Sequence, residues 1–132
     1  MRVISIISLK GGVAKTTTSV NMAYILYKQG FRVLLIDNDK QGNASKTLGS
    51  YNPEDKNTVA RIMLERGLDI WEIIKKTTYS DSGAGTLDII TANMELLEAN
   101  MRTIVDTGRQ QQTRFEKALT AVSDQYDFCI ID

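Results

Sequence analysis

Four short apolar runs, each of a length suited to one β-strand, limit what this chain can fold into. They are residues 2–8, 31–37, 86–91 and 126–132. The first two are almost uninterrupted stretches of β-branched and aliphatic side chains. Such runs are typical of strands covered on both faces, as in parallel sheets. Between these two, apolar side chains recur at helical spacing over residues 16–29 and stop before Gly30, and glycine is common just past a helix end.

The order of these segments predicts an α/β fold. Strand, helix and strand over residues 2–37 form a βαβ unit, whose crossover is almost always right-handed. The polar segment 38–45 is predicted to be a loop. Further helices are predicted at residues 58–66, 69–76, 93–103 and 111–123. Thr58 and Asp69 would be the N-caps of the first two of these helices.

This alternation predicts a doubly wound, mostly parallel sheet with flanking helices, in which ligands bind at the carboxyl ends of the strands. The last strand ends on Asp132, with no helix after it to cover that part of the sheet. We therefore expect residues 1–132 to be the N-terminal part of a single larger domain whose C-terminal half is absent.

Composition excludes several kinds of chemistry. The 132 residues include 16 Lys and Arg, 16 Asp and Glu and no His, which excludes Ser-His-Asp triads and His-ligated zinc. A lone Cys129 cannot form an internal disulfide and fits a reducing compartment. A net charge of zero gives no global attraction to nucleic acid or to an acidic membrane. No apolar run approaches the ~20 residues that span a bilayer, and the start is not a signal peptide. We therefore expect a cytoplasmic protein.

The turn between the first predicted strand and the first helix carries the main functional signal. It reads SLKGGVAKTTT over residues 8–18. Successive glycines let backbone N–H groups point into a concavity, and the helix that follows adds its positive N-terminal end. Lys15 and Thr16 stand where a P-loop has its phosphate-binding lysine and its Mg²⁺-binding hydroxyl. The strict P-loop pattern fails because Leu9 and Ala14 occupy its glycine positions. The alternative interpretation is a Gly-Gly turn that only joins strand to helix.

Three blocks of the chain resemble motifs of one ATPase family. Residues 10–18, KGGVAKTTT, resemble the deviant Walker A motif of the ParA/MinD superfamily of P-loop ATPases. Residues 33–45, VLLIDNDKQGNAS, resemble the second motif of its ParA/Soj partitioning branch, and residues 126–132, YDFCIID, resemble the Walker B strand. The blocks come in family order, and Gln-Gly-Asn in the second separates ParA-like from MinD-like proteins. The resemblance implies a P-loop NTPase-like fold.

The resemblance also implies a role for individual residues. The catalytic residues would be Lys10, Lys15 and Asp39. Lys10 would reach across a dimer interface to the partner's nucleotide, Lys15 would bind the β- and γ-phosphates, and Asp39 would position the attacking water. The nucleotide-binding residues would be Gly11, Gly12, Val13, Ala14, Lys15, Thr16 and Thr17. Thr16 would ligate Mg²⁺ directly, and Asp37 and Asp132 would hold it through water. For Asp37 and Asp39 the alternative interpretation is a solvated turn after a strand.

Two departures from the family pattern bear on the site. Ala14 replaces the usual glycine, and if that position needs a positive φ the methyl group costs on the order of 1 kcal/mol. Lys40 replaces the usual proline, which frees the loop and adds a positive charge beside Asp39.

The function implied by the resemblance is that of a ParA-like ATP hydrolase in plasmid or chromosome partitioning. Its cofactors would be ATP and Mg²⁺. It would form a homodimer on ATP binding, bind DNA without sequence preference, respond to a ParB-like centromere-binding protein and associate with the nucleoid, with no membrane partner. Without the family's second half, residues 1–132 are expected to bind nucleotide poorly and to hydrolyse nothing. Two alternatives stay open: a MinD-like membrane-cycling ATPase, and a nucleotide-responsive binding module without turnover.

Overall fold

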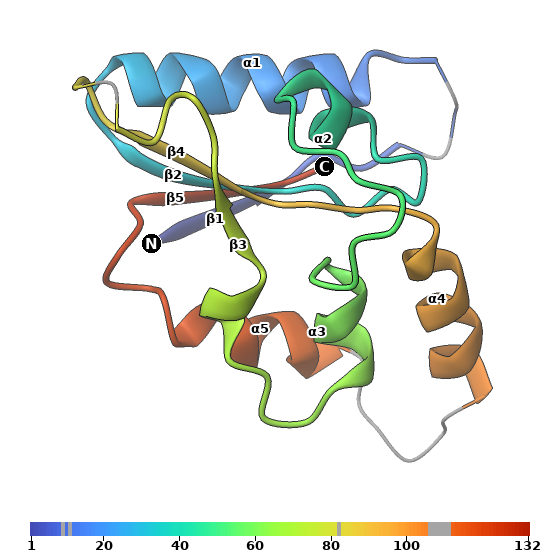
Figure 1. Cartoon of the computed structure of the whole chain (residues 1–132). Coiled ribbons are helices and arrows are strands. Elements are labelled where there is room, and N and C mark those ends of the chain that lie inside the picture. Colours follow the sequence, from blue (N-terminus) through green and yellow to red (C-terminus); the bar gives the residue numbers. More distant parts are fainter. Residues whose placement is uncertain (9, 11, 82, 106–111) are drawn as a thin grey trace.

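The fold, seen in a computed structural model, is built on one five-stranded sheet (Figure 1). The structure describes residues 1–8, 10, 12–81, 83–105 and 112–132. The strands are β1 (Arg2–Ser5), β2 (Arg32–Ile36), β3 (Ile74–Lys76), β4 (Thr86–Ile90) and β5 (Phe128–Ile131). Their order across the sheet is β1-β5-β2-β4-β3. All neighbours are parallel except β3, which is antiparallel to β4, so the predicted α/β class with a mostly parallel sheet is confirmed.

Helices cover both faces of this sheet. They are α1 (Lys15–Lys28), α2 (Asn43–Thr47), α3 (Ala60–Leu64), α4 (Glu95–Val105) and α5 (Gln112–Thr120), with a short 3₁₀ turn, η1 (Ile70–Glu72). Figure 1 shows α1 and α2 on one side of the sheet and α3, α4 and α5 on the other. Helices on both faces are the mark of a doubly wound sheet. Within the described ranges, every helix is too short or too polar to cross a membrane.

Residues 33–36 of the central strand β2 are all apolar, and the burial of the strand explains why. Leu34 and Ile36 lie in the hydrophobic cluster that includes α3, α4 and α5. Val33 and Leu35 lie in the opposite cluster, with Ala23 of α1. All five side chains are fully buried. Because successive side chains of a strand point to opposite faces, a strand covered on both faces must be apolar at every position.

The expectation that a strand is covered on both faces is wrong for the first strand. β1 spans Arg2–Ser5, and Val3 on it is 50% exposed while Ile7, just beyond, is 83% exposed. β1 pairs with β5 along one edge, and no other described strand pairs with its second edge. The apolar run over residues 2–8 therefore predicts the strand correctly, but the strand is less buried than expected.

The segment predicted as a helix over residues 69–76 is also different. Asp69 does act as a cap, since its side chain accepts a hydrogen bond from the N–H of Trp71 at 3.1 Å. The helix stops after the single turn η1, and the chain then forms β3, with Ile74 opposite Ile90. Ile70 and Ile73 are buried. Pairing with the free edge of β4 thus overrides the helical spacing of these isoleucines.

Two smaller predictions are wrong as well. Thr58 is not an N-cap: α3 begins after Val59, and the Thr58 hydroxyl is buried with no hydrogen-bond partner in the described part of the chain. The polar loop over residues 38–45 gives way at Asn43 to the short helix α2, which Gly42 introduces with a φ of 63°.

Candidate functional site

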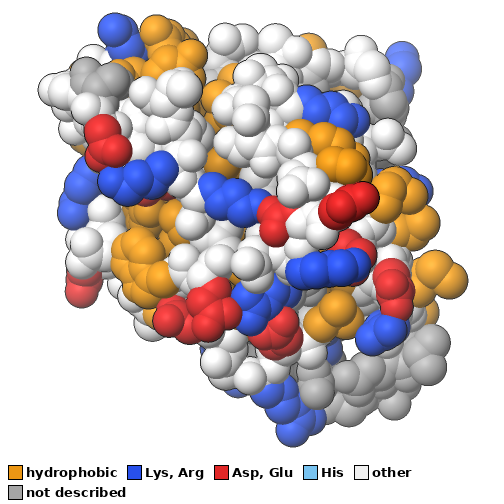
Figure 2. Space-filling view, in the orientation of Figure 1, with side chains coloured by type: hydrophobic (Ala, Val, Ile, Leu, Met, Phe, Trp, Pro, Cys, Tyr) orange, Lys and Arg blue, Asp and Glu red, His pale blue; other side chains and the backbone are white. Residues whose placement is uncertain are grey.

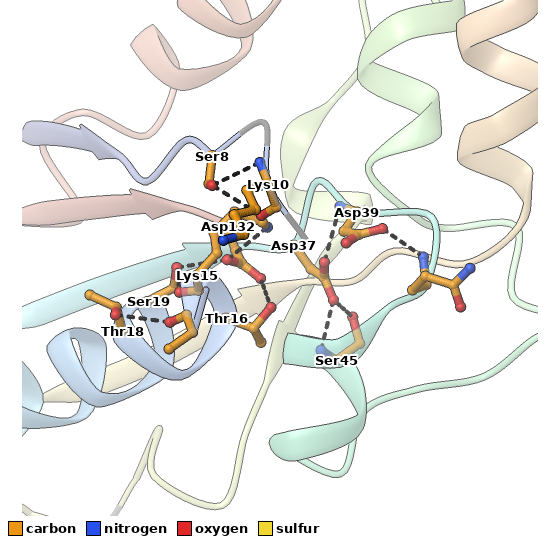
Figure 3. Close-up of polar contacts among 12 residues, drawn as sticks. Ser8, Lys10, Lys15, Thr16, Thr18, Ser19, Asp37, Asp39, Ser45 and Asp132 are labelled. Atoms are coloured by element: carbon orange, nitrogen blue, oxygen red, sulfur yellow. Dashed lines mark hydrogen bonds and ion pairs between the residues drawn. The ribbon is translucent and has the colours of Figure 1, made fainter. Parts of the chain in front are cut away.

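The site lies where β2 and β5 end, next to the start of α1 (Figure 3). Asp37 directly follows β2, and Asp132 directly follows β5. The two strands are parallel neighbours, so their carboxyl ends meet at one edge of the sheet. The N–H of Asp132 donates to the carbonyl of Ile36 at 2.9 Å, and the N–H of Asn38 donates to the carbonyl of Asp132 at 3.1 Å. Backbone pairing alone therefore holds both carboxylates at this edge.

The carboxylate of Asp132 is the centre of the contacts. The Lys15 ammonium lies 3.0 Å from Oδ1, forming an ion pair, and the Thr16 hydroxyl donates to Oδ2 at 2.8 Å. The Ser19 hydroxyl lies 2.7 Å from Oδ1. The Asp132 side chain is 0% exposed, whereas that of Lys15 is 23% exposed. The structure thus brings together Lys15, Thr16 and Asp132, three of the site residues that the family resemblance implies.

Asp37 is the second buried carboxylate of the site. Its Oδ2 accepts from the N–H of Ser45 at 2.8 Å and from the Ser45 hydroxyl at 2.7 Å. Its Oδ1 accepts from the N–H of Asp39 at 3.2 Å. Burial raises the pKa of Asp37 above its usual value; the hydrogen bonds from Ser45 and Asp39 act in the opposite direction, and the nearby negative charge of Asp132 adds to the rise. Two adjacent buried carboxylates make this edge a region that favours a cation.

The hydroxyl oxygen of Thr16 and the carboxylate oxygens of Asp37 and Asp132 are suitable ligands for Mg²⁺. This ion prefers oxygen ligands, keeps several waters and is usually bound through one or two carboxylates together with substrate phosphates. The Thr16 hydroxyl and the carboxylate of Asp132 are already in contact, and Asp37 directly follows the neighbouring strand β2. The ammonium of Lys15 at the same place suits a phosphate. The residues present therefore fit both groups.

The loop before α1 has the backbone of an anion-binding turn. Gly12 has a φ of 72° and Ala14 a φ of 60°. Ala14 is the N-cap of α1 and supplies no side-chain hydrogen bond to the first turn, so the amides of that turn are not capped by it. Such uncapped amides at a helix N-terminus favour an anion. Gly12, Val13 and Ala14 are all exposed.

The backbone of Lys10 is hydrogen-bonded to the side chain of Ser8. Its N–H donates to the hydroxyl of Ser8 at 3.2 Å, and that hydroxyl donates to the carbonyl of Lys10 at 3.1 Å. The Lys10 residue is exposed, and no ion pair of its side chain occurs among the described residues. Thr17 is exposed on the first turn of α1. Gly11 lies outside the described residues.

Asp39 is not drawn into the cluster around Lys15. Its Oδ1 accepts from the N–H of Gln41 at 3.0 Å, and its carbonyl accepts from the N–H of Gly42 at 2.8 Å. In Figure 3 it lies on the far side of Asp37 from Lys15. The structure thus puts Asp39 in a partly exposed turn, and its role with water stays a prediction.

Sequence reasoning missed two serines of the site, Ser19 and Ser45. Ser19 comes four residues after Lys15, a spacing that puts both on one helix face, and this spacing is the signal that would have found it. Ser45 links two strand ends, because its hydroxyl donates to Asp37 and accepts from the N–H of Ala92 at 3.0 Å. Nothing in the sequence indicates that second contact, which joins α2 to the segment that follows β4.

Comparison with known proteins agrees with this geometry. The AAA domain family matches residues 1–132. The sporulation initiation inhibitor protein Soj of Bacillus subtilis is 40% identical over 131 residues, which cover 99% of this chain and 49% of Soj. Cobyrinic acid a,c-diamide synthase from Mycobacterium smegmatis, solved with a bound ATP analog and magnesium, superposes with a TM-score of 0.85 at 30% identity, covering 100% of this chain and 49% of that one.

A second solved structure, apo McdA from Cyanothece, has a TM-score of 0.85 at 26% identity and covers 100% of this chain and 49% of McdA. The chain spans about half the length of the relatives it matches. These neighbours have the P-loop type of doubly wound sheet that the sequence predicts. Because the family match extends over residues 1–132, the chain belongs to the AAA domain family.

Proposed function

We propose that this chain is the N-terminal part of a ParA-like ATPase that binds ATP and Mg²⁺ where β2 and β5 end. One observation carries the proposal: the ammonium of Lys15 and the hydroxyl of Thr16 converge on the carboxylate of Asp132, at 3.0 and 2.8 Å, at the N-terminus of α1. An ammonium, a hydroxyl and a carboxylate at such a helix end are the groups that a triphosphate and its Mg²⁺ require. The ATP analog and magnesium in the M. smegmatis neighbour support the assignment.

Each site residue then has a task. Lys15 binds the terminal phosphates, Thr16 is the direct Mg²⁺ ligand, and Asp37 and Asp132 hold the ion through water. Bound Mg²⁺ supplies positive charge that stabilises the transferring phosphoryl group. Backbone N–H groups of the loop hold phosphate at Gly11, Gly12, Val13 and Ala14, and Thr17 on the first turn of α1 holds the α-phosphate.

The hydrolytic step is assigned to Lys10 and Asp39. Lys10 is exposed on the loop, so its ammonium is accessible to a second copy of the chain. In an ATP-dependent homodimer, each Lys10 would complete the partner's site and stabilise charge in the transition state, as an arginine finger does. Asp39 would position the attacking water from its turn beside Asp37.

Similarity to proteins named for partitioning, among them the chromosome partitioning protein ParA of Myxococcus xanthus and a plasmid partition protein from Borrelia burgdorferi, supports a partitioning role. We propose that the dimer binds DNA without sequence preference, associates with the nucleoid in the cytoplasm, and is stimulated by a ParB-like partner. Figure 2 shows acidic and basic side chains interspersed over one face of the molecule, with neither sign gathered into a continuous patch. We therefore assign the DNA surface to other parts of the assembled protein.

The uncovered edge of the sheet supports a larger domain. Val3 of β1 and Ile7 are strongly exposed. On α1, Met22, Ile25 and Leu26 line an apolar groove of about 440 Å³. We propose that a further part of the same domain covers these surfaces, and relatives about twice as long as this chain support that proposal.

Phosphate release by the protein at its full natural length tests this function. We expect Mg²⁺-dependent ATP hydrolysis there and none from residues 1–132 alone. Lys10→Ala should lower turnover by about 10³-fold or more, the range of arginine-finger effects, while nucleotide binding is retained. Lys28→Ala, which removes an exposed lysine from the opposite end of α1, is the control and should leave turnover unchanged. Equal turnover in the wild type and Lys10→Ala would reject the role of Lys10.

A further inference from the structure

The hydroxyl of Ser19 makes a contact that the family pattern of the loop does not include. Ser19 is 0% exposed on α1. Its Oγ lies 2.7 Å from Oδ1 of Asp132 and 3.0 Å from the carbonyl oxygen of Lys15. A serine hydroxyl has one proton to donate. Because an ionised carboxylate is the stronger acceptor and forms the shorter bond, this proton belongs to the bond with Asp132.

The three donors on Asp132 differ in what else they can reach. Lys15 and Thr16 are partly exposed, and the proposed function assigns both to ligands, namely phosphate and metal. Ser19 is completely shielded from solvent and cannot touch a ligand. Its bond to Asp132 is therefore the one that can persist when Lys15 and Thr16 turn to the nucleotide.

We infer that Ser19 is a positioning residue, which fixes the orientation of the Asp132 carboxylate so that this group can hold Mg²⁺ through water. The inference rests on the proposed function. Partners that hydrogen-bond metal-binding carboxylates from behind set their orientation, and their loss typically weakens metal affinity by 10–100-fold. The bond also satisfies one lone pair of a carboxylate that has no exposure to water, which keeps that group fixed in the absence of ligand.

The chain offers a matched control next to Ser19. The Thr18 hydroxyl donates to the carbonyl of Ala14 at 2.9 Å, but Thr18 is exposed and its hydroxyl does not contact Asp132. Ser19→Ala and Thr18→Ala therefore each remove one hydroxyl from the N-terminal part of α1, and only the first removes a contact to the site.

The first test is calorimetric titration of the protein at its full natural length with ATP, once in the presence of Mg²⁺ and once in the presence of EDTA. We expect Ser19→Ala to reduce the Mg²⁺-dependent gain in ATP affinity by roughly 10–100-fold, with affinity in EDTA unchanged. Thr18→Ala should match the wild type under both conditions. If Ser19→Ala and Thr18→Ala respond alike to Mg²⁺, the inference is overturned. A wild-type chain that binds no ATP overturns the proposed function and, with it, the link from Ser19 to the metal.

The second test needs no ligand. A double-mutant cycle by urea unfolding combines Ser19→Ala with Asp132→Asn, which removes the charge but keeps the size of the side chain. We expect loss of the Ser19 hydroxyl to change the unfolding equilibrium constant about tenfold more when residue 132 is Asp than when it is Asn, because a bond to a charged acceptor is the stronger one. No coupling between the two substitutions would overturn the anchoring of Asp132 by Ser19, whatever the nucleotide result.

Discussion

Ala14 is where the candidate site stores backbone strain. Its φ of 60° makes it the one described residue other than glycine with a positive φ. The left-handed conformation places Cβ too close to the following carbonyl and costs an L-residue roughly 1–2 kcal/mol. The strain lies at the N-cap of α1, directly before Lys15.

Ala14→Gly should therefore stabilise the chain. Removing the methyl group relieves the strain, and the greater freedom of glycine in the unfolded chain takes back part of the gain. We expect the free energy of unfolding in urea to rise by about 0.5–1 kcal/mol. Ala84→Gly, at an exposed position without a positive φ, is the control and should lower it by about 0.4–1 kcal/mol. A loss of stability in both variants would contradict the assignment of strain to Ala14.

Several residues of the candidate site could be predicted from the sequence motifs. Lys15, Thr16 and Asp132 are predicted from their motifs and meet in the structure. The condition on which the expected cost of Ala14 depends, a positive φ at that position, is met by its φ of 60°. Ser45 was not predictable, because its importance lies in contacts to Asp37 and Ala92, which come from different strands. A sequence reveals residues that carry chemistry more readily than residues that hold them in place.

At the scale of elements, the turn into α2 decides how Asp37 is held. Gly42 precedes the helix that presents Ser45, with a φ of 63°. A Cβ on Gly42 would lie 2.7 Å from the carbonyl oxygen of Ala92 and 2.7 Å from the ring of Tyr51. Glycine is required here both for its backbone conformation and for its lack of a side chain.

Gly42→Ala should be more damaging than an alanine at a glycine with similar backbone geometry. Gly49 has a φ of 69° and open space around its missing Cβ, so Gly49→Ala should cost about 1 kcal/mol from backbone strain alone. Gly42→Ala should cost about 1–3 kcal/mol more, the usual effect of overpacking. Urea unfolding of the two variants measures the difference. Equal costs would mean that α2 moves freely away from Tyr51 and Ala92.

The segment that forms η1 and β3 shows what the spacing of apolar residues does not predict. The run Ile70, Ile73 and Ile74 has helical spacing, yet the chain makes one 3₁₀ turn and then β3. Local spacing predicts which side chains are buried, and Ile70 and Ile73 are indeed buried. It does not predict that the free edge of β4 is available for pairing, because β4 follows later in the chain.

At the scale of the whole molecule, the order of the strands creates the site. The order β1-β5-β2-β4-β3 brings the last strand of the chain between the first two. Asp132 is thereby placed beside Asp37 and opposite the loop that leaves β1, although 95 positions separate the two aspartates in the sequence. The alternation of strands and helices predicted the class of fold, but only the family resemblance predicted that these carboxylates act together.

The proposed function requires that the turn into α1 binds a triphosphate with its Mg²⁺. Calorimetric titration of residues 1–132 with ATP and Mg²⁺, in the wild type and in Lys15→Ala, tests this binding. Lys28→Ala, at the opposite end of α1, is the control for loss of a lysine from this helix. Because residues 1–132 are expected to bind nucleotide poorly, we expect weak, Mg²⁺-dependent binding in the wild type and in Lys28→Ala and no detectable binding in Lys15→Ala, with all three folded by circular dichroism. Binding that survives unchanged in Lys15→Ala, or no detectable binding by the wild type, would contradict the proposed site.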